Sequence, residues 1–351
     1  MGFVKKEITD KNKGWVVDVP VKYIIWTRPD VVRKVFNIIK VSRPSILFLI
    51  SDGGRNPLEK EKIAESRRIV SDIDWNCTVY TYYLDDNHGM YTMMKETGKL
   101  IFDIVDRCVF LEDDDLPSES FIPFCAEMLE RYKDDMRIAL ISGYNVLGSY
   151  SKPSSDYFFS REGSIWGFAT WKRTYKSFLD NDLECSNDVY TKELILNNSR
   201  DRDCFDRMFE NYSQGKKYDG HDAGEEFFQT LSIVSQNQLY IIPKKNLISN
   251  IGVRGDGAHT VSDDYLPNGL KKLYNTDTYE LGFPLKHPKY VIADEYYFDQ
   301  LAKRLGVNRP YKVFWWRLVM LIKMIISGNS KMAVSKMNGM LQRISNNRDE
   351  N

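Results

Sequence analysis

Four consecutive acidic residues, Glu112 to Asp115, are the part of the sequence best suited to chemistry. They directly follow the apolar residues 108–111. Burying adjacent carboxylates at the end of a strand is costly unless a cation lies nearby. Mg²⁺ and Mn²⁺ prefer oxygen ligands and often take some of them from water and substrate phosphates. The cluster therefore indicates either a site for a divalent cation and a diphosphate, or a solvated acidic turn before a helix.

The residues after the acidic cluster are typical of a helix start. Pro117 and Ser118 favour the first positions of a helix, with Ser118 as N-cap and Glu119 in the first turn. Apolar residues then recur at spacings of three and four along one helical face. The acids are therefore expected between a strand and a helix, at the carboxyl end of the strand, where open α/β sheets bind ligands.

The first third of the chain alternates between strand-like and helix-like segments. The expected strands are 21–26, 45–50, 78–83 and 107–111, and the expected helices are 31–40, 59–70 and 90–105. This alternation predicts an α/β fold in which a mostly parallel central sheet is flanked by helices.

Length and composition permit such a fold. The 351 residues, 42% of them hydrophobic, are enough for one large domain or two small ones. Residues 1–13 are polar, so no signal peptide is expected. The five cysteines have no paired spacing, which argues against a disulfide framework or a zinc site and favours a reducing, cytoplasmic compartment.

Charge is distributed unevenly along a chain with no net charge. Residues 301–348 hold ten basic and no acidic residues; with Asp349 and Glu350 the tail carries +8, so residues 1–300 carry −8. Residues 311–326 mix aromatic, aliphatic and basic residues and are too short and too charged to span a bilayer. This pattern favours a helix at an anionic membrane surface, with packing on the body or on a second subunit as the alternative. An acidic body without a recognition motif argues against a nucleic-acid partner.

Several short motifs, in a fixed order, carry a family resemblance. They occupy residues 26–30, 51–56, 87–89, 111–114, 141–145, 165–171, 250–252 and 257–260. From residue 23 to residue 259 the chain resembles the GT-A type glycosyltransferases, in particular the bacterial family-2-like sugar transferases that are sometimes labelled hemolysin-like. The resemblance implies a GT-A domain over 1–300, with a nucleotide-binding half at about 20–145 and an acceptor half at about 146–265, followed by a basic extension over 301–351.

The resemblance also implies roles for the acidic cluster. Asp114 would bind Mn²⁺ or Mg²⁺, and Glu112 and Asp113 would approach the ribose and the nucleotide. His259 would close the site late in the chain, at the metal or the diphosphate, helped by glycines that permit close backbone approach. Asp115 stands where the family has a non-acidic residue, so it either helps the metal or faces solvent.

The loops after the first two strands are implied to bind the nucleotide. Asp52 resembles the acid that accepts a hydrogen bond from a uracil N–H, since a carboxylate is acceptor-only. Thr27, Arg28 and Arg55 fall near the nucleotide, and a guanidinium fits a phosphate well. A surface ion pair is the alternative for both arginines.

An inverting transfer needs a base for the acceptor hydroxyl. Glu225 is the first choice and Asp222 the second, because both fall on acidic positions of the family's stretch here. The family's tryptophan positions are Gly224 and Phe228 in this chain. Asp222 has the alternative role of capping a helix over 224–235.

An aromatic loop is expected after a strand at 157–160. Trp166 and Gly167 are interpreted as lining the acceptor or donor sugar, since sugar C–H faces pack on aromatic rings, and Trp171 is interpreted as a core residue. An aromatic-rich core loop is the alternative for the whole segment.

The sequence therefore predicts metal-dependent transfer of a sugar from a nucleotide diphosphate, with UDP as the expected nucleotide, to a hydroxyl of a surface-glycan or lipid-linked acceptor. One alternative is a sugar nucleotidylyltransferase, although residues 26–30 lack the glycines of its phosphate loop. The other is a non-catalytic glycan-binding protein. The expected location is the cytoplasm, at the inner face of the plasma membrane.

Overall fold

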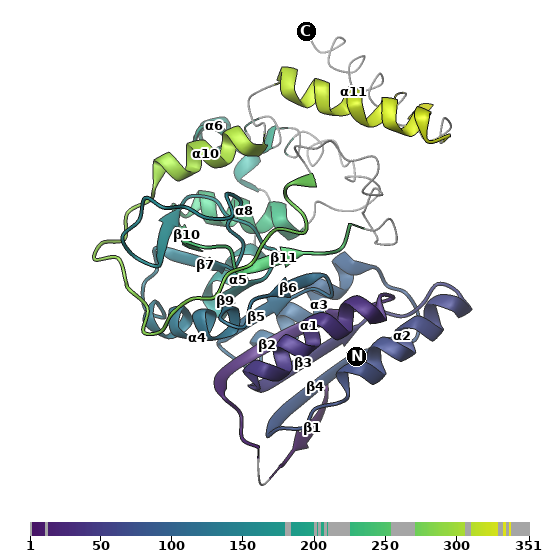
Figure 1. The fold of residues 1–351 in the computed structure, drawn as a ribbon. Coiled ribbons are helices and arrows are strands. Elements are labelled where there is room, and N and C mark those ends of the chain that lie inside the picture. The colour runs from purple at the N-terminus through teal and green to yellow at the C-terminus, as the bar shows by residue number, and fades with distance from the viewer. Residues whose placement is uncertain are drawn as a thin grey trace.

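A computed structural model shows an α/β fold (Figure 1). It describes residues 2–10, 13–179, 184–199, 225–253, 271–305 and 310–328, together with a few single residues outside these ranges.

The first third contains the predicted alternation. Its elements are β1 (Val4–Ile8), β2 (Val17–Ile25), α1 (Pro29–Ser42), β3 (Pro44–Ser51), α2 (Pro57–Val70), β4 (Cys77–Tyr83), α3 (Met90–Phe102) and β5 (Arg107–Leu111). Every strand and helix expected here is confirmed within a few residues of its bounds. Proline at the start of α1 and α2 fits the first helical turn, where its missing N–H costs nothing.

The remaining elements are shorter and less regular. They are β6 (Asp115–Pro117), α4 (Phe121–Arg131), β7 (Ile138–Ser142), β8 (Tyr157–Ser160), β9 (Phe168–Trp171), α5 (Lys172–Leu179), the 3₁₀ helix η1 (Glu184–Asn187), α6 (Val189–Asn198), α8 (Glu225–Ser235), β10 (Leu239–Pro243), β11 (Ile248–Asn250), α10 (Glu295–Leu305) and α11 (Pro310–Ile326).

In the described part of the chain, nine strands form one sheet in the order β1-β4-β3-β2-β5-β9-β7-β10-β8. The pairs β4-β3, β3-β2, β2-β5 and β7-β10 are parallel, while β1, β9 and β8 run against their neighbours. The sheet is therefore mostly parallel, as expected. The carboxyl ends of β2, β3, β4 and β5 meet at one edge, where the loops with the acidic residues begin.

Both faces of the sheet are covered by helices. Tyr23 of β2 points toward α1, where its hydroxyl donates to the Val32 carbonyl over 3.1 Å. The adjacent Lys22 points the other way, toward Met94 of α3, because side chains alternate along a strand. α2 and α4 lie with α1, and α5 and α8 lie with α3.

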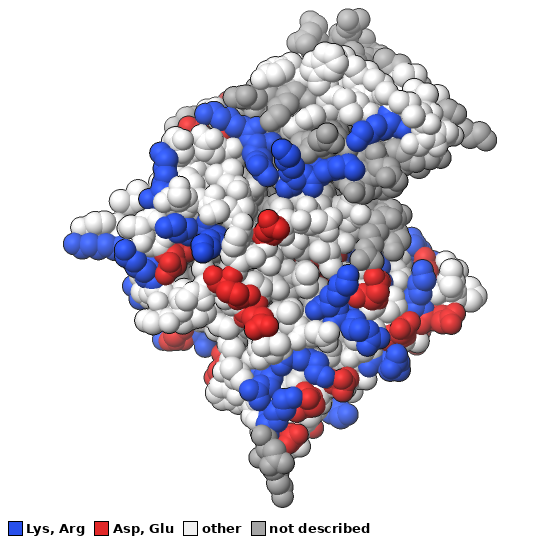
Figure 2. Space-filling view, in the orientation of Figure 1, with Lys and Arg blue, Asp and Glu red and all other residues white. Residues whose placement is uncertain are grey.

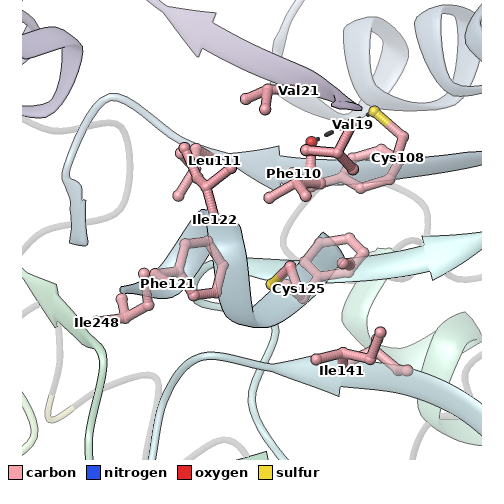
Figure 3. Close-up of a cluster of buried hydrophobic side chains, with 14 of the residues drawn as sticks. Val19, Val21, Cys108, Phe110, Leu111, Phe121, Ile122, Cys125, Ile141 and Ile248 are labelled. Atoms are coloured by element: carbon pink, nitrogen blue, oxygen red, sulfur yellow. Dashed lines mark hydrogen bonds between the residues drawn. The ribbon is translucent and has the colours of Figure 1, made fainter. Parts of the chain in front are cut away.

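The core between the sheet and α4 explains why the segment after the acids becomes a helix. Figure 3 shows Phe121, Ile122 and Cys125 of α4 against Leu111 and other strand residues. These side chains are fully buried or nearly so. Burial of this apolar stripe stabilises α4 and keeps the end of β5 in place.

The predicted start of this helix is wrong. Ser118 does not cap α4; the helix begins at Phe121, with Ser120 at the N-cap position. Residues 115–117 instead form β6, which pairs with β11 far along the chain, Asn250 opposite Asp115. This tertiary pairing holds the backbone extended where local sequence favours a helical turn.

The C-terminal helices differ in their packing. Tyr297 and Leu301 of α10 belong to the main core, so the predicted boundary at residue 300 falls within a packed helix. In Figure 1, α11 lies beyond α10, away from the sheet. Among the residues that the structure describes, no helix combines the length and apolarity needed to cross a bilayer.

Candidate functional site

The acidic cluster lies at the carboxyl end of β5 and is largely buried. Asp113, Asp114 and Asp115 are 5%, 7% and 1% exposed. This burial rules out the interpretation of Asp115 as a solvent-facing residue. Its Oδ2 accepts hydrogen bonds from the backbone N–H groups of Glu112 (3.2 Å) and Gly167 (2.9 Å). Asp115 therefore closes the acidic turn and ties it to the segment that leads into β9.

Arg28, in the loop after β2, contacts two of these acids. Its Nε donates to Asp113 Oδ2 over 3.1 Å, its Nη2 donates to Asp113 Oδ1, and its Nη1 lies 3.1 Å from Asp114 Oδ2. Burial alone would lower the pKa of Arg28, but the two carboxylates outweigh it and raise the pKa above its ordinary value. The Arg28 side chain is only 11% exposed, and its guanidinium offsets part of the negative charge of the two aspartates.

The loop after β11 lies directly on the acids. The Ile251 N–H donates to the Asp114 carbonyl over 2.9 Å. A Cβ added to Gly252 would lie 1.8 Å from Asp114 Oδ2 and 2.9 Å from Arg28 Nη1. The glycine at residue 252 therefore permits close approach of the backbone to the acidic cluster.

Two carboxylate oxygens in the cluster lack partners. Asp114 Oδ1 and Asp115 Oδ1 are buried and accept no hydrogen bond from any residue that the structure describes. Burial, followed by the charges of Glu112 and Asp114, raises the pKa of Asp115 well above its ordinary value. Unpartnered buried acceptors are costly, and a bound cation would remove that cost.

These oxygens suit a hard divalent cation, because Mg²⁺ and Mn²⁺ favour carboxylates. Within the described ranges, no group of three or more His, Cys, Asp or Glu side chains is arranged to hold a metal. A cation here would therefore need further ligands from water or from a bound diphosphate. The donor set fits that kind of shared site.

Asp52, after β3, has a different environment. Its Oδ1 accepts from the Gly53 (2.8 Å) and His88 (2.9 Å) N–H groups, and its Oδ2 accepts from Asn87 Nδ2 and the Gly89 N–H, both over 2.8 Å. Four donors use the full acceptor capacity of a carboxylate. In this structure Asp52 joins two loops, and its role as a uracil acceptor stays a prediction.

Arg67 of α2 supports this edge of the sheet, and the sequence analysis missed it. Its guanidinium donates to Ser51 Oγ over 3.0 Å and to the Leu84 carbonyl over 2.6 Å, bridging the ends of β3 and β4. The available signal was its register: Arg67 follows Ile63 by four residues and precedes Val70 by three, which puts it beside the buried stripe of α2.

Arg55 makes the surface ion pair that was its alternative interpretation. Its Nη2 lies 2.7 Å from Glu59 Oε1, one helical turn away, with the Arg55 side chain 58% exposed. Its guanidinium also stacks on the Trp26 ring at 4.8 Å. Thr27, which follows Trp26 in the sequence, is buried in the loop after β2. The nucleotide-binding roles of Thr27 and Arg55 stay predictions.

The aromatic segment is only partly a loop. Residues 168–171 form β9 in the middle of the sheet, where Trp171 is buried and donates from Nε1 to the Leu129 carbonyl. Its core role is confirmed, whereas the prediction of a loop is wrong for these residues, because β5 and β7 pair with them on both sides.

Trp166 and Gly167 lie beside the acidic cluster. The half-buried Trp166 ring packs against Tyr144 and Tyr274, with ring centroids 5.1 Å apart in each case. Gly167 has φ +55°, and a Cβ there would lie 2.4 Å from Ile248 Cδ1. A side chain at residue 167 would therefore be strained and would force the Ile248 side chain of β11 to shift. Contact of either residue with a sugar stays a prediction.

Three predicted residues cannot be placed in this geometry. His259 and Asp222 lie outside the described residues. Glu225 is the first residue of α8, and its side chain is not described. The base and the late histidine remain predictions, while the structure brings Arg28, Asp113, Asp114 and Gly252 together.

Comparisons with known proteins show only distant similarity. No family model and no curated protein matches the chain. Among solved structures, S. aureus TarS residues 1–349 align with a TM-score of 0.36 and 9% identity, over 66% of this chain and 59% of TarS. Mouse xyloside xylosyltransferase 1 has a TM-score of 0.36 and 10% identity, over 64% of this chain and 84% of its own. The 4-diphosphocytidyl-2C-methyl-D-erythritol synthase of Anaerococcus prevotii has a TM-score of 0.31 and 11% identity, over 47% and 77%.

Proposed function

We propose that this chain is a metal-dependent glycosyltransferase that moves a sugar from a nucleotide-diphosphate donor, a UDP-sugar, to a hydroxyl of a surface-glycan or lipid-linked acceptor. One observation carries the proposal. Buried aspartates with unpartnered oxygens, Asp114 and Asp115, lie at the carboxyl edge of a mostly parallel sheet. Such an edge is where α/β proteins bind nucleotides, and the open oxygens suit a cation shared with a diphosphate.

On the donor side, Asp114 would hold Mn²⁺ or Mg²⁺, with His259 joining it from the segment that follows β11. A bound cation would stabilise the negative charge that develops on the leaving diphosphate. Arg28 holds Asp113 and Asp114 in position, and its fork of N–H donors also suits a phosphate. Glu112, Asp52 and Thr27 complete the proposed nucleotide site.

On the acceptor side, Glu225 or, as second choice, Asp222 would remove the proton from the attacking hydroxyl, with inversion at the sugar carbon. Trp166 and Gly167 are the proposed sugar-contacting residues. Their place beside the acidic cluster supports this, since Gly167 donates directly to Asp115. We further propose a cytoplasmic location at the inner face of an anionic membrane, supported by the basic residues over 301–348.

The first test is a thermal-shift screen of UDP, GDP, ADP and CDP with and without Mn²⁺. A ligand that binds only the native state raises the melting temperature. We expect UDP with Mn²⁺ to give the largest shift, and Asp114→Asn to lose the part that depends on Mn²⁺. No shift with any nucleotide would contradict the proposal. Pyrophosphate release from a nucleoside triphosphate and a sugar phosphate would instead identify a nucleotidylyltransferase.

A further inference from the structure

We infer that the outward face of α11 is a lipid-binding surface that lies in the plane of an anionic membrane. The apolar residues of this face recur at spacings of three and four and form one stripe, named here the α11 stripe. Its members are Tyr311, Phe314, Trp315, Leu318, Ile322 and Ile325. The inference deepens the proposed function by naming the residues of its membrane partner site.

The α11 stripe faces away from the rest of the protein. Trp315 and Ile325 are each 59% exposed, whereas Met324 on the opposite side of the helix is fully buried. At 100° per residue, Met324 lies about 130° around the helix from the centre of the stripe. α11 therefore packs by the side that carries Met324, and most of the α11 stripe is exposed.

Basic residues border the stripe on both sides. In the helical register, Arg317 lies about 110° from the centre of the stripe on one side and Lys323 about 130° from it on the other, both toward the face that carries Met324. In Figure 2 the region of α11 is mostly white, with blue side chains and no red ones on it. An apolar face with cationic borders is the arrangement of helices that lie at a lipid interface.

Charge decides which partner fits this face. Residues 301–348 contain ten basic and no acidic residues. A symmetric contact with a second copy would put the same surface on both sides and bring like charges together. An anionic lipid surface attracts each of these charges, and aromatic rings such as Trp315 favour the boundary between lipid and water. The observations therefore favour lipid over self-association.

The length of α11 sets its orientation. Its 17 residues span about 25 Å at 1.5 Å per residue, less than the roughly 30 Å of a hydrocarbon core. If α11 crossed the bilayer, Arg317 and Lys323 would also have to enter its hydrocarbon core. α11 is therefore expected to lie along the surface, with the stripe inserted and the basic residues at the headgroups.

The test is co-sedimentation of the full chain with vesicles of phosphatidylglycerol and phosphatidylcholine in equal amounts, and with phosphatidylcholine alone. We expect binding to the anionic vesicles that weakens as salt rises. Trp315→Glu with Ile322→Glu should reduce the partition coefficient at least about tenfold, since it removes the inserted surface. Arg317→Gln with Lys323→Gln keeps the stripe and should reduce it about 25-fold, or about fivefold per charge.

A matched control adds the same charge elsewhere. Val189 and Tyr190 of α6 are also exposed, at 77% and 71%, so Val189→Glu with Tyr190→Glu should leave vesicle binding unchanged. Each variant is checked for the thermal shift with UDP and Mn²⁺, which separates failure of this inference from failure of the proposed function. No vesicle binding, equal loss in the control, or self-association abolished by the Trp315→Glu, Ile322→Glu variant would each overturn the inference.

Discussion

The loops after β3 and β5 lie at the same edge of the sheet, and both carry buried carboxylates, but their environments differ. Asp52, after β3, accepts four hydrogen bonds from the protein. After β5, Asp114 and Asp115 each retain one buried oxygen without a partner in the described part of the chain. The two loops therefore offer a ligand very different chemistry.

This difference distinguishes a carboxylate that stabilises a loop from carboxylates that could bind a cation. A carboxylate whose acceptor positions are all used stabilises its loop whether or not a ligand is bound. Carboxylates that are buried, close together and incompletely bonded raise the energy of the empty protein and gain most from a cation. We therefore interpret Asp52 as a residue that holds the proposed nucleotide-binding loop after β3 in place, and the loop after β5 as the candidate metal site.

The largest expected effect is that of Asp114→Asn. The substitution keeps the size of the side chain and removes the charge that would hold the metal. We expect the rate of UDP release from a UDP-sugar to fall at least about a hundredfold at saturating Mn²⁺, because a bound metal would stabilise the transition state by several kcal/mol. The fold should persist, as circular dichroism would show. Unchanged turnover would mean that the open oxygens are not the metal site.

The next largest effect is expected for Asp52→Ala, which should lower the free energy of unfolding. Four donors would lose their shared acceptor, and a hydrogen bond to a charged group contributes roughly 1.5–3 kcal/mol. We expect the free energy of unfolding in urea to fall by about 3 kcal/mol, and Asp52→Asn to cost less because one oxygen remains. If Asp52→Ala removed the preference for UDP over GDP and ADP at unchanged stability, base reading would be its main role.

Gly252→Ala should have an intermediate effect, confined to the site. The added methyl group would meet Asp114 and Arg28, and overpacking of this kind costs about 1–3 kcal/mol. We expect the affinity for UDP with Mn²⁺, measured by calorimetry, to fall about tenfold. Gly282→Ala is the matched control, because a Cβ there would meet nothing within 4 Å. Equal affinities in both variants would place Asp114 outside the binding site.

The smallest effect is expected for Arg55→Ala. Its ion pair with Glu59 is exposed, and pairs of this kind contribute at most about 1 kcal/mol. We expect a change in melting temperature near the limit of measurement and no change in UDP affinity. A clear loss of UDP affinity would support the nucleotide-binding role that the resemblance implies for Arg55 and would extend the site across both loops.

Much of the fold could be predicted because its signals are local. Alternating apolar segments and helical stripes marked β2, β3, β4 and β5 with the helices between them. β9 was missed because four residues held between β5 and β7 take their conformation from their neighbours. The predicted helix start at Ser118 was wrong for the same reason, because residues 115–117 pair with β11 as an extended strand.

Some residues of the candidate site could be predicted from the sequence and others could not. The family resemblance, together with the position of each residue after a strand, singled out Asp113, Asp114 and Arg28, and the structure brings these three side chains together. Residue type could not distinguish Asp52 from Asp114, or Arg55 from Arg28. That distinction depends on which donors and acceptors face each group.

The sequence by itself determined the α/β class, the acidic edge and the cationic C-terminal segment, because composition, periodicity and charge are properties of the chain. Only the tertiary structure decided that Arg28 pairs with Asp113 and Asp114, that Gly252 lies against Asp114, and that Asp52 accepts four hydrogen bonds. Arg28 and Gly252 lie 224 positions apart in the sequence, yet both reach Asp114. Contacts over such separations depend on how β2, β5 and β11 come together in space, and no local pattern records them.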